Sequence, residues 1–291
     1  MARPKENTNR INVFLSDEDY AALRKKADSQ GSNVSLIVRS LIKKDLYQTV
    51  ADGGSVEYHR ASFIGANTVY LPVIAENKYS MSVEQNVFVA KRNIVDYIWK
   101  SAKLEGMAVT YPETEAIYNG LVVSGMHVDD IQAINNLKHA WRFILDMVDY
   151  PTNYPLICKV NQHVGVNLMF NAGFLRNVPV SIGGTSWKPD LPIEAQIKDE
   201  IASIISLSNP TDRAVTLMLY LMRKQMFIDG NKRTAMLAGN HVMIAHGAGV
   251  LSVPIELQPQ FTGMLVRYYE TNDMSEIKMF AYDMCIDGIE F

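Results

Sequence analysis

The chain has 291 residues and a formal net charge of −3, with 48% hydrophobic and 20% charged residues. This length predicts about two domains, and the composition is that of a globular protein with enough apolar residues for a core. The longest apolar stretches are shorter than the ~20 residues of a bilayer-spanning helix, so we expect no membrane segment and a cytoplasmic location. Cys158 and Cys285 are far apart and lack metal-type neighbours, which argues against a disulfide framework or a zinc site.

The first fifty residues predict a small βαα module. In the segment from residue 10 to 16 the side chains alternate, so that Arg10, Asn12 and Phe14 share one face of a strand. A helix is expected from residue 16 or 17 to about 30, and a second one from residue 33 or 35 to 46. One strand and two short helices cannot bury a sufficient core alone, so we expect a homodimer.

Residues 1–50 resemble a ribbon-helix-helix DNA-binding module, in which two paired strands enter the major groove. The resemblance implies that Arg10, Asn12 and Phe14 face the bases, where Arg and Asn can bind guanine and adenine edges. Nine basic against six acidic residues in this segment give a net charge of only +3, a modest electrostatic contribution to DNA binding. The alternative is a dimerisation arm that does not contact DNA.

Residues 51–85 are expected to form a linker and an irregular segment, because Asp52-Gly53-Gly54-Ser55 is typical of a flexible boundary. Residues 68–71 resemble a strand. Ser82 and Gln85 form a capping-box pattern that opens a helix predicted to run to Gly106. On this helix Glu105 lies on the same face as the apolar residues, so its carboxylate needs a partner.

Residues 86–291 predict a mainly α domain, a helical bundle with one β-hairpin. Helices are expected at 128–145, 192–206, 212–224, 232–246, 259–271 and 275–286. Val178, Val180 and Ile182 alternate with other residues before Gly183-Gly184, which favours a hairpin. Pro179 restricts that strand to an edge position.

The segment from Phe227 to Thr234 has the chemistry of a phosphate site. Gly230 can adopt backbone angles that aim consecutive N–H groups at one point, and the helix after it adds its N-terminal dipole. Asn231, Lys232 and Arg233 follow, of which Arg233 is a forked and permanently charged donor. Asp229 would repel a phosphate unless a hard cation such as Mg²⁺ bridged the two. The alternative is an ordinary loop with a surface acid and base.

The run Gln225-Met226-Phe227-Ile228-Asp229-Gly230-Asn231-Lys232-Arg233-Thr234-Ala235-Met236 resembles the signature of the Fic/Doc (Fido) family, His-Pro-Phe-x-Asp-Gly-Asn-Gly-Arg-x-x-Arg. The resemblance covers roughly residues 86 to 286. It implies a loop that binds ATP phosphates through Gly230, Asn231, Lys232 and Arg233, with Mg²⁺ at Asp229. The family's His, Pro and final Arg are replaced by Gln225, Met226 and Met236.

The substitution at Gln225 limits the activity that can be expected. In the family the His is the base that accepts the proton of a target hydroxyl during AMP transfer. A carboxamide has no titratable proton near neutral pH, and general-base catalysis is worth ~10²–10⁴-fold in rate. We therefore expect a weak or inactive, nucleotide-binding regulatory protein. The alternatives are an active AMP transferase with a substituted base, and a DNA-binding transcription regulator whose Fic-like half is an interaction platform.

Two further segments resemble parts of the same family. Ser101-Ala102-Lys103-Leu104-Glu105-Gly106 is similar to the inhibitory motif (Ser/Thr)-x-x-x-Glu-(Gly/Asn), whose Glu pairs with the final Arg of the loop. Because that position is Met236, we expect Glu105 to meet Lys232 or Arg233, or else to reach solvent. The segment 173–184 is similar to the flap, which implies that a protein target adds as a strand along Val178, Val180 and Ile182.

Overall fold

The computed structural model describes residues 17–29 and 74–290. The chain divides into a unit that ends at Ser55 and a unit that begins at Val56. Helix α1 (Asp17–Ser29) belongs to the first unit and agrees with the first helix predicted there. The predicted DNA-contacting residues Arg10, Asn12 and Phe14, the second helix of that module and the strand at 68–71 lie outside the described residues.

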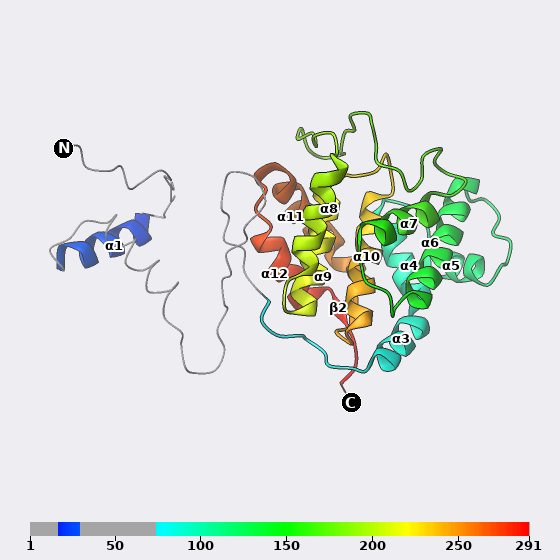
Figure 1. Cartoon of the computed structure of the whole chain (residues 1–291), viewed down its shortest axis with the longest axis horizontal. Coiled ribbons are helices and arrows are strands. Elements are labelled where there is room, and N and C mark those ends of the chain that lie inside the picture. The colour runs from blue at the N-terminus through cyan, green and yellow to red at the C-terminus, as the bar shows by residue number, and fades with distance from the viewer. Residues whose placement is uncertain (1–16, 30–73, 291) are drawn as a thin grey trace. The chain divides into compact units, whose positions relative to one another are not determined.

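The described part of the second unit is mainly helical, as the sequence predicts (Figure 1). Its elements are α3 (Val83–Arg92), α4 (Ile94–Leu104), α5 (Tyr111–Tyr118), α6 (Val128–Asp146), α7 (Tyr154–Gly165), α8 (Glu194–Ile205), α9 (Pro210–Lys224), α10 (Asn231–Ala245), β1 (Val250–Leu251), the 3₁₀ helix η1 (Ile255–Leu257), α11 (Gln258–Thr271), α12 (Ser275–Met284) and β2 (Ile286–Asp287). No helix among the described residues has the length and apolar character needed to cross a bilayer.

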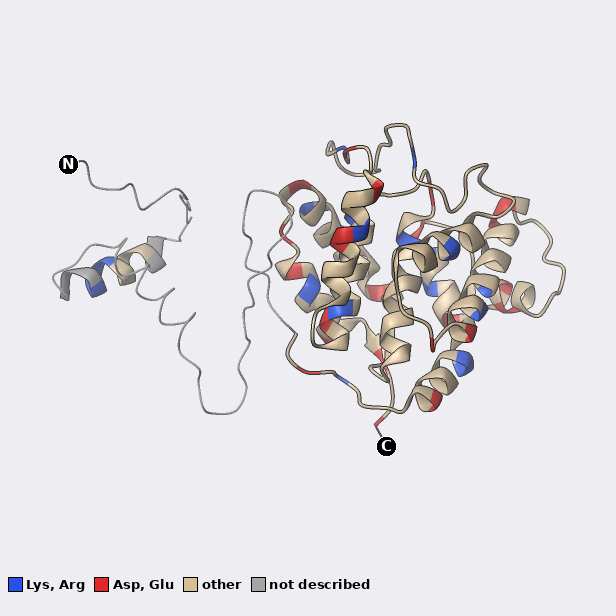
Figure 2. Cartoon of the chain, viewed as in Figure 1, with Lys and Arg blue, Asp and Glu red and all other residues tan. Residues whose placement is uncertain are grey.

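Helix α10 lies between two hydrophobic cores. Its residues Met236 and Val242 belong to a core shared with α8, α9, α11 and α12, whereas Leu237 and Ile244 belong to a second core shared with α3, α4, α6 and α7. Figure 1 shows α10 between these two groups of helices. The charged residues of its neighbour α9 lie near the helix ends (Figure 2). The loop between α9 and α10 therefore starts and ends on well-packed helices.

The single helix predicted from Ser82 to Gly106 is wrong, because the structure contains two helices separated at Asn93. The backbone of Asn93 has φ −105° and ψ 11°, outside the helical range. Asn has a low helix propensity because its side chain competes for local backbone hydrogen bonds. The predicted capping box is confirmed: Ser82 Oγ accepts from Gln85 N–H at 3.2 Å, and Gln85 Oε1 accepts from Ser82 N–H at 2.7 Å.

The predicted hairpin does not form a strand ladder. Residues 178–182 contain no strand, although Gly183-Gly184 does form a turn, and the one sheet in the described residues is the antiparallel pair β1–β2. Pro179 removes a backbone donor, and an isolated two-stranded ribbon is only marginally stable in water. Residues 178–190 are called the flap segment from here on.

Helices α5 and α7 were not predicted, although both carry start signals. Thr110 and Glu113 form a capping box before α5, with Thr110 N–H donating to Glu113 Oε2 at 2.7 Å. Asn153 caps α7 by accepting from Leu156 N–H at 3.0 Å, and a proline lies in its first turn. Their first-turn signals were present in the sequence, and α7 carries residues that contact the site.

Candidate phosphate site at the start of helix α10

The loop from Gln225 to Gly230 is held by hydrogen bonds to its carbonyl groups, one from the backbone N–H of Arg176 and others from the side chains of Asn161 and Asn231. Arg176 N–H donates to Met226 O at 3.0 Å, and Asn161 Nδ2 donates to Asp229 O at 3.1 Å. Asn231 Nδ2 donates to Phe227 O at 2.8 Å, while its Oδ1 accepts from Phe227 N–H at 3.0 Å. In a trans peptide the N–H group points opposite to the C=O group. The carbonyls of residues 226, 227 and 229 point toward Arg176, Asn231 and Asn161, so the N–H groups of residues 227, 228 and 230 point away from these three residues.

Gly230 begins α10 with a left-handed backbone, φ 74°. A Cβ at this position would lie 2.9 Å from Val164 Cγ1 and 3.3 Å from Asn161 Nδ2, so both the backbone and the space require glycine. The unpaired N–H groups of the first helical turn, together with the helix dipole, favour a negative charge at this end of α10.

Two cations lie in that first turn and face the end of α4. The Lys232 ammonium is 3.0 Å from Glu105 Oε2, and its Nζ also donates to Leu104 O at 3.3 Å. Arg233 is only 5% exposed, and its Nε lies 3.6 Å from Glu105 Oε1, too far for a hydrogen bond. The expected contact between Glu105 and the two cations is present, and Arg233 Nε has no hydrogen-bond partner among the described residues.

Asp229 supplies a second carboxylate at the same place. Its Oδ1 accepts from Gly230 N–H at 2.6 Å and its Oδ2 accepts from Arg233 Nη2 at 3.2 Å, while the side chain remains 63% exposed. Three of the donors expected to bind an anion, Gly230 N–H, Lys232 Nζ and Arg233 Nη2, are therefore occupied by the carboxylates of Asp229 and Glu105. An external anion would have to replace them.

Gln225 ends α9 in a left-handed conformation, φ 48° and ψ 58°. Its Nε2 donates to Met222 O at 2.6 Å, and its backbone carbonyl accepts from Arg176 Nε at 2.6 Å. The two histidines that follow the loop are bound elsewhere: His241 contacts Thr152 and Met147, and His246 contacts Val242 and Arg213. The structure thus provides neither of these histidines as a replacement base.

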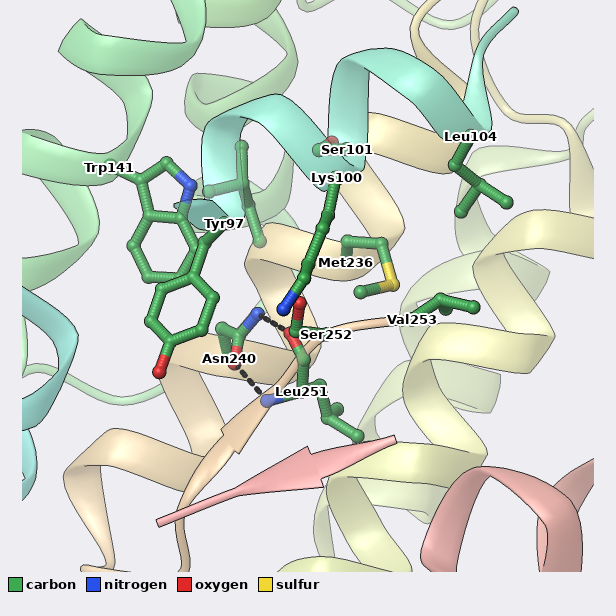
Figure 3. A pocket seen from close by; sticks show the side chains of 11 residues that line it. Tyr97, Lys100, Ser101, Leu104, Trp141, Met236, Asn240, Leu251, Ser252 and Val253 are labelled. Carbon is green, nitrogen blue, oxygen red and sulfur yellow. Dashed lines mark hydrogen bonds between the residues drawn. The ribbon is translucent and has the colours of Figure 1, made fainter. Parts of the chain in front are cut away.

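Met236, which stands at the position of the final Arg of the signature, faces a small cavity behind α4 (Figure 3). The cavity holds about 10 Å³, room for about one water molecule, and Ser101 and Ser252 also line it. Met236 is 7% exposed and carries no charge, so it offers nothing to a carboxylate. This explains why Glu105 meets Lys232 and Arg233 instead.

Residues 151–243 match the sequence model of the Fic/DOC family. The protein carries a Fic/DOC domain. The match begins just before α7 and ends within α10, so it contains the flap segment, the loop and both cations.

Two curated relatives are protein adenylyltransferases by name. The chain is 24% identical over 188 residues to the protein adenylyltransferase fic-1 of Caenorhabditis elegans and 25% identical over 180 residues to that of Caenorhabditis briggsae. Each match covers 58% of this chain and 35% of the relative, so the chain spans about a third of the length of these proteins.

Solved structures show the same fold. A structure of Fic-1 from Caenorhabditis elegans matches with a TM-score of 0.59 at 18% identity, covering 92% of this chain and 74% of that one. A Fic domain containing signaling protein from Bacteroides thetaiotaomicron matches with a TM-score of 0.54 at 17% identity, covering 70% of this chain and 90% of that one. At these identities the likeness concerns the fold.

The structure brings predicted site residues from the end of α4 together with those of the matched loop. Glu105 and the loop from 229 to 233 meet, Gly106 ends the inhibitory segment with φ 83°, and Ser101 lies one turn earlier beside Met236. In the flap segment Val178 is exposed, whereas Ile182 packs partly against the core. Sequence reasoning missed Asn161 and Arg176, because a single Asn or Arg carries no signal of the contacts it makes far along the chain.

Proposed function

We propose that this protein binds a nucleotide through the start of α10 and that its capacity for AMP transfer is weak or absent. The proposal rests on one observation: Arg233 Nε is buried at the N-terminus of α10 and finds no hydrogen-bond partner within residues 17–29 and 74–290. A buried donor without a partner costs about 1–3 kcal/mol of free energy, so a ligand group that accepts a hydrogen bond from it binds more tightly because this cost is removed. The relatives are adenylyltransferases by name, which supports ATP as the ligand.

The donor set fits the phosphates of ATP. Gly230 N–H, Lys232 Nζ and Arg233 currently bind the carboxylates of Asp229 and Glu105, so this surface already accommodates negative oxygen atoms. Phosphate oxygens accept the same hydrogen bonds and carry more charge. Phosphate would take the place of the Asp229 and Glu105 carboxylates.

Asp229 fits a magnesium ion that takes its other ligands from phosphates and water. Its side chain is 63% exposed, and a carboxylate is the hard oxygen ligand that Mg²⁺ prefers. No group of three or more His, Cys, Asp or Glu residues in the described ranges could hold a metal alone. A magnesium ion bound there would neutralise charge between Asp229 and the phosphates.

Gln225 explains why transfer is weak. Moving AMP from ATP to a protein hydroxyl forms an oxygen–phosphorus bond, releases pyrophosphate and leaves the hydroxyl proton to be accepted. Gln225 Nε2 is bound to Met222 O, which leaves Oε1 to accept a hydrogen bond from the hydroxyl. The amide can orient the hydroxyl but cannot remove its proton near neutral pH.

Glu105 acts as the inhibitory residue in this proposal. It binds both cations that the phosphates need, from the end of a different helix, so nucleotide and Glu105 compete for Lys232 and Arg233. Leu104, the last residue of α4, packs against the core that contains Met236 and Val253, which holds the end of that helix in place.

Calorimetry with ATP and Mg²⁺ tests nucleotide binding. We expect heat of binding for the wild type and its loss in Arg233→Ala, while Lys232→Ala weakens binding. The matched control is Arg267→Ala, since Arg267 forms an exposed bidentate pair with Glu276. If the wild type and both loop variants give no heat, the Fic/DOC domain is an interaction platform and the proposal fails.

An AMP-transfer assay with labelled ATP tests the second half of the proposal. Gln225→His restores a titratable group at the start of the loop, so we expect this variant to transfer AMP faster by about 10²–10⁴-fold. Equal rates for the wild type and Gln225→His would show that another group removes the proton.

DNA binding through the first fifty residues stays a proposal. Helix α1 fits the predicted module, but Arg10, Asn12 and Phe14 lie outside the described residues. Binding to random-sequence DNA with Arg10→Ala as the comparison, together with the oligomeric state in solution, tests the DNA-binding and homodimer predictions.

A further inference from the structure

Arg176 is buried beside the loop, and its guanidinium binds backbone carbonyl groups of the described chain. The residue is 3% exposed. Its Nε donates to Gln225 O at 2.6 Å, its Nη1 to Val178 O at 2.9 Å, and its Nη2 to Pro189 O at 3.3 Å and to Asp190 O. Its backbone N–H adds the bond to Met226 O. One side chain thus connects the loop with both ends of the flap segment.

No carboxylate in the described residues forms an ion pair with this guanidinium, which is unusual for a buried arginine. Burial lowers the pKa of Arg176, and the nearby charge of Asp190 opposes this effect. Arginine stays protonated in proteins, so the four carbonyl dipoles stabilise the charge. The planar fork reaches carbonyl groups in three directions, which a lysine ammonium on a single stem does not match.

The flap segment depends on such contacts because it lacks a ladder of its own. Its far end is held a second time, by Trp187, which stacks on Tyr269 at 5.8 Å and lies under the Arg223 guanidinium at 4.4 Å. Thr185 Oγ1 also donates to Glu270 Oε1 at 2.8 Å. Between these two ends, Ile182 packs partly against the core.

We infer that Arg176 is a positioning residue that fixes the flap segment relative to Gln225, so that a target segment lying along the flap brings its hydroxyl to the Gln225 amide. The positioning of a target hydroxyl rests on the function proposed above. The hydrogen-bonded link of Arg176 between the flap segment and the loop does not depend on that function. Arg176 binds the backbone of Gln225 and Met226 at the start of the loop, whereas the anion donors Gly230 N–H, Lys232 and Arg233 have other partners.

Methyl NMR of isoleucine-labelled protein tests the connection, because Ile182 lies in the flap segment and Ile228 in the loop. We expect Arg176→Lys to shift and broaden the Ile182 and Ile228 methyl signals, while the signals of Ile134 and Ile197, which are fully buried, stay in place. Arg213→Lys is the matched control, since Arg213 also binds a carbonyl through Nε and Nη2, at Leu207 O, but lies outside the site. It should leave Ile182 and Ile228 unchanged.

Unmoved Ile182 and Ile228 signals in Arg176→Lys, or the same change in Arg213→Lys, would overturn the inference. If Arg176→Lys does not fold, hydrogen exchange in the wild type is the test. The Arg176 Nε–H should exchange slowly with water, because it is buried and donates to Gln225 O. Fast exchange would refute the link between Arg176 and the loop. Calorimetry separates the two proposals. A wild type without nucleotide affinity contradicts only the proposed function, whereas unmoved Ile182 and Ile228 signals in Arg176→Lys contradict only the inference about Arg176.

Discussion

Gln225 combines a strained backbone with the position of the missing base. The left-handed conformation of a residue other than glycine costs about 1–2 kcal/mol, and here it is stabilised by the bond from Arg176 Nε to Gln225 O and by Asn231, which holds the next turn. Such strain is common where a backbone must present a functional group. The strained backbone therefore lies at the position that the signature gives to His.

A comparison of Gln225→Ala with Gln225→Gly isolates this backbone strain. Both variants lose the bond to Met222 O, and they differ only in the Cβ that the left-handed conformation disfavours. After allowing for the greater entropy of glycine in the unfolded chain, we expect Gln225→Gly to be more stable by about 0.5–1 kcal/mol. Urea denaturation measures the difference. Equal stability, or a more stable alanine variant, would mean that the turn relaxes in solution.

At the scale of elements, the sequence predicted the long amphipathic helices but not the helix boundaries and short helices that depend on single caps and turns. Helix α6 was predicted to within one residue because its apolar residues recur over five turns. The break at Asn93 and the short helix α5 depend on single caps and turns, which periodicity does not detect. The hairpin failed because its stability would have required a partner strand, and the chain holds the segment by Arg176 and Trp187 instead.

The contact between the ends of α4 and α10 yields a second prediction. Glu105→Gln removes the charge that competes with phosphate for Lys232 and Arg233 but keeps the size of the side chain. A hydrogen bond to a charged group is worth about 1.5–3 kcal/mol, so the Kd for ATP with Mg²⁺ should fall by about 10- to 150-fold. Calorimetry measures it.

Glu276→Gln is the control for that experiment, because Glu276 is paired with Arg267 on the surface of α12 and is 60% exposed. It should leave nucleotide affinity unchanged. An unchanged Kd in Glu105→Gln, with normal binding in the wild type, would show that Glu105 does not restrain the site.

At the scale of the whole molecule, a buried ion pair connects α12 to the start of α9. Lys278 Nζ lies 2.6 Å from Asp212 Oδ1, their side chains are 2% and 4% exposed, and Asp212 Oδ1 also accepts from Ile74 N–H at 3.0 Å. Breaking a buried pair by removing one partner leaves an uncompensated charge, so Lys278→Met should destabilise the fold by about 3–5 kcal/mol. Chemical denaturation is the measurement.

The exposed pair of Lys198 and Glu194 provides the matched control. Their side chains are 52% and 56% exposed, and an exposed pair contributes about 0–1 kcal/mol, so Lys198→Met should change stability little. Adding Asp212→Leu to Lys278→Met should recover part of the loss, because the remaining charge disappears. A small effect of Lys278→Met would mean that water reaches Asp212 through the start of α9.

His241 makes the stability of the fold depend on pH. It is fully buried, its Nε2 lies 2.8 Å from Met147 O and its Nδ1 lies 2.6 Å from Thr152 Oγ1. A carbonyl can only accept, so Nε2 carries the proton and Nδ1 accepts from the hydroxyl in the neutral ring. Burial lowers the pKa of His241; the bond to Met147 O partly opposes this, and the charge of His246 adds to the lowering.

Because the folded state binds this proton less readily than the unfolded chain, the contribution of His241 is complete above the unfolded pKa of about 6.5 and is lost as pH falls below it. The slope reaches at most about 1.4 kcal/mol per pH unit. We expect the Tm of the wild type to fall between pH 7.5 and pH 5.5 by more than that of His241→Gln. His163, whose pKa burial also lowers, contributes to both proteins and cancels in the difference. Identical pH profiles would mean that His241 can take up a proton without cost, so that the core between α6 and α10 admits charge.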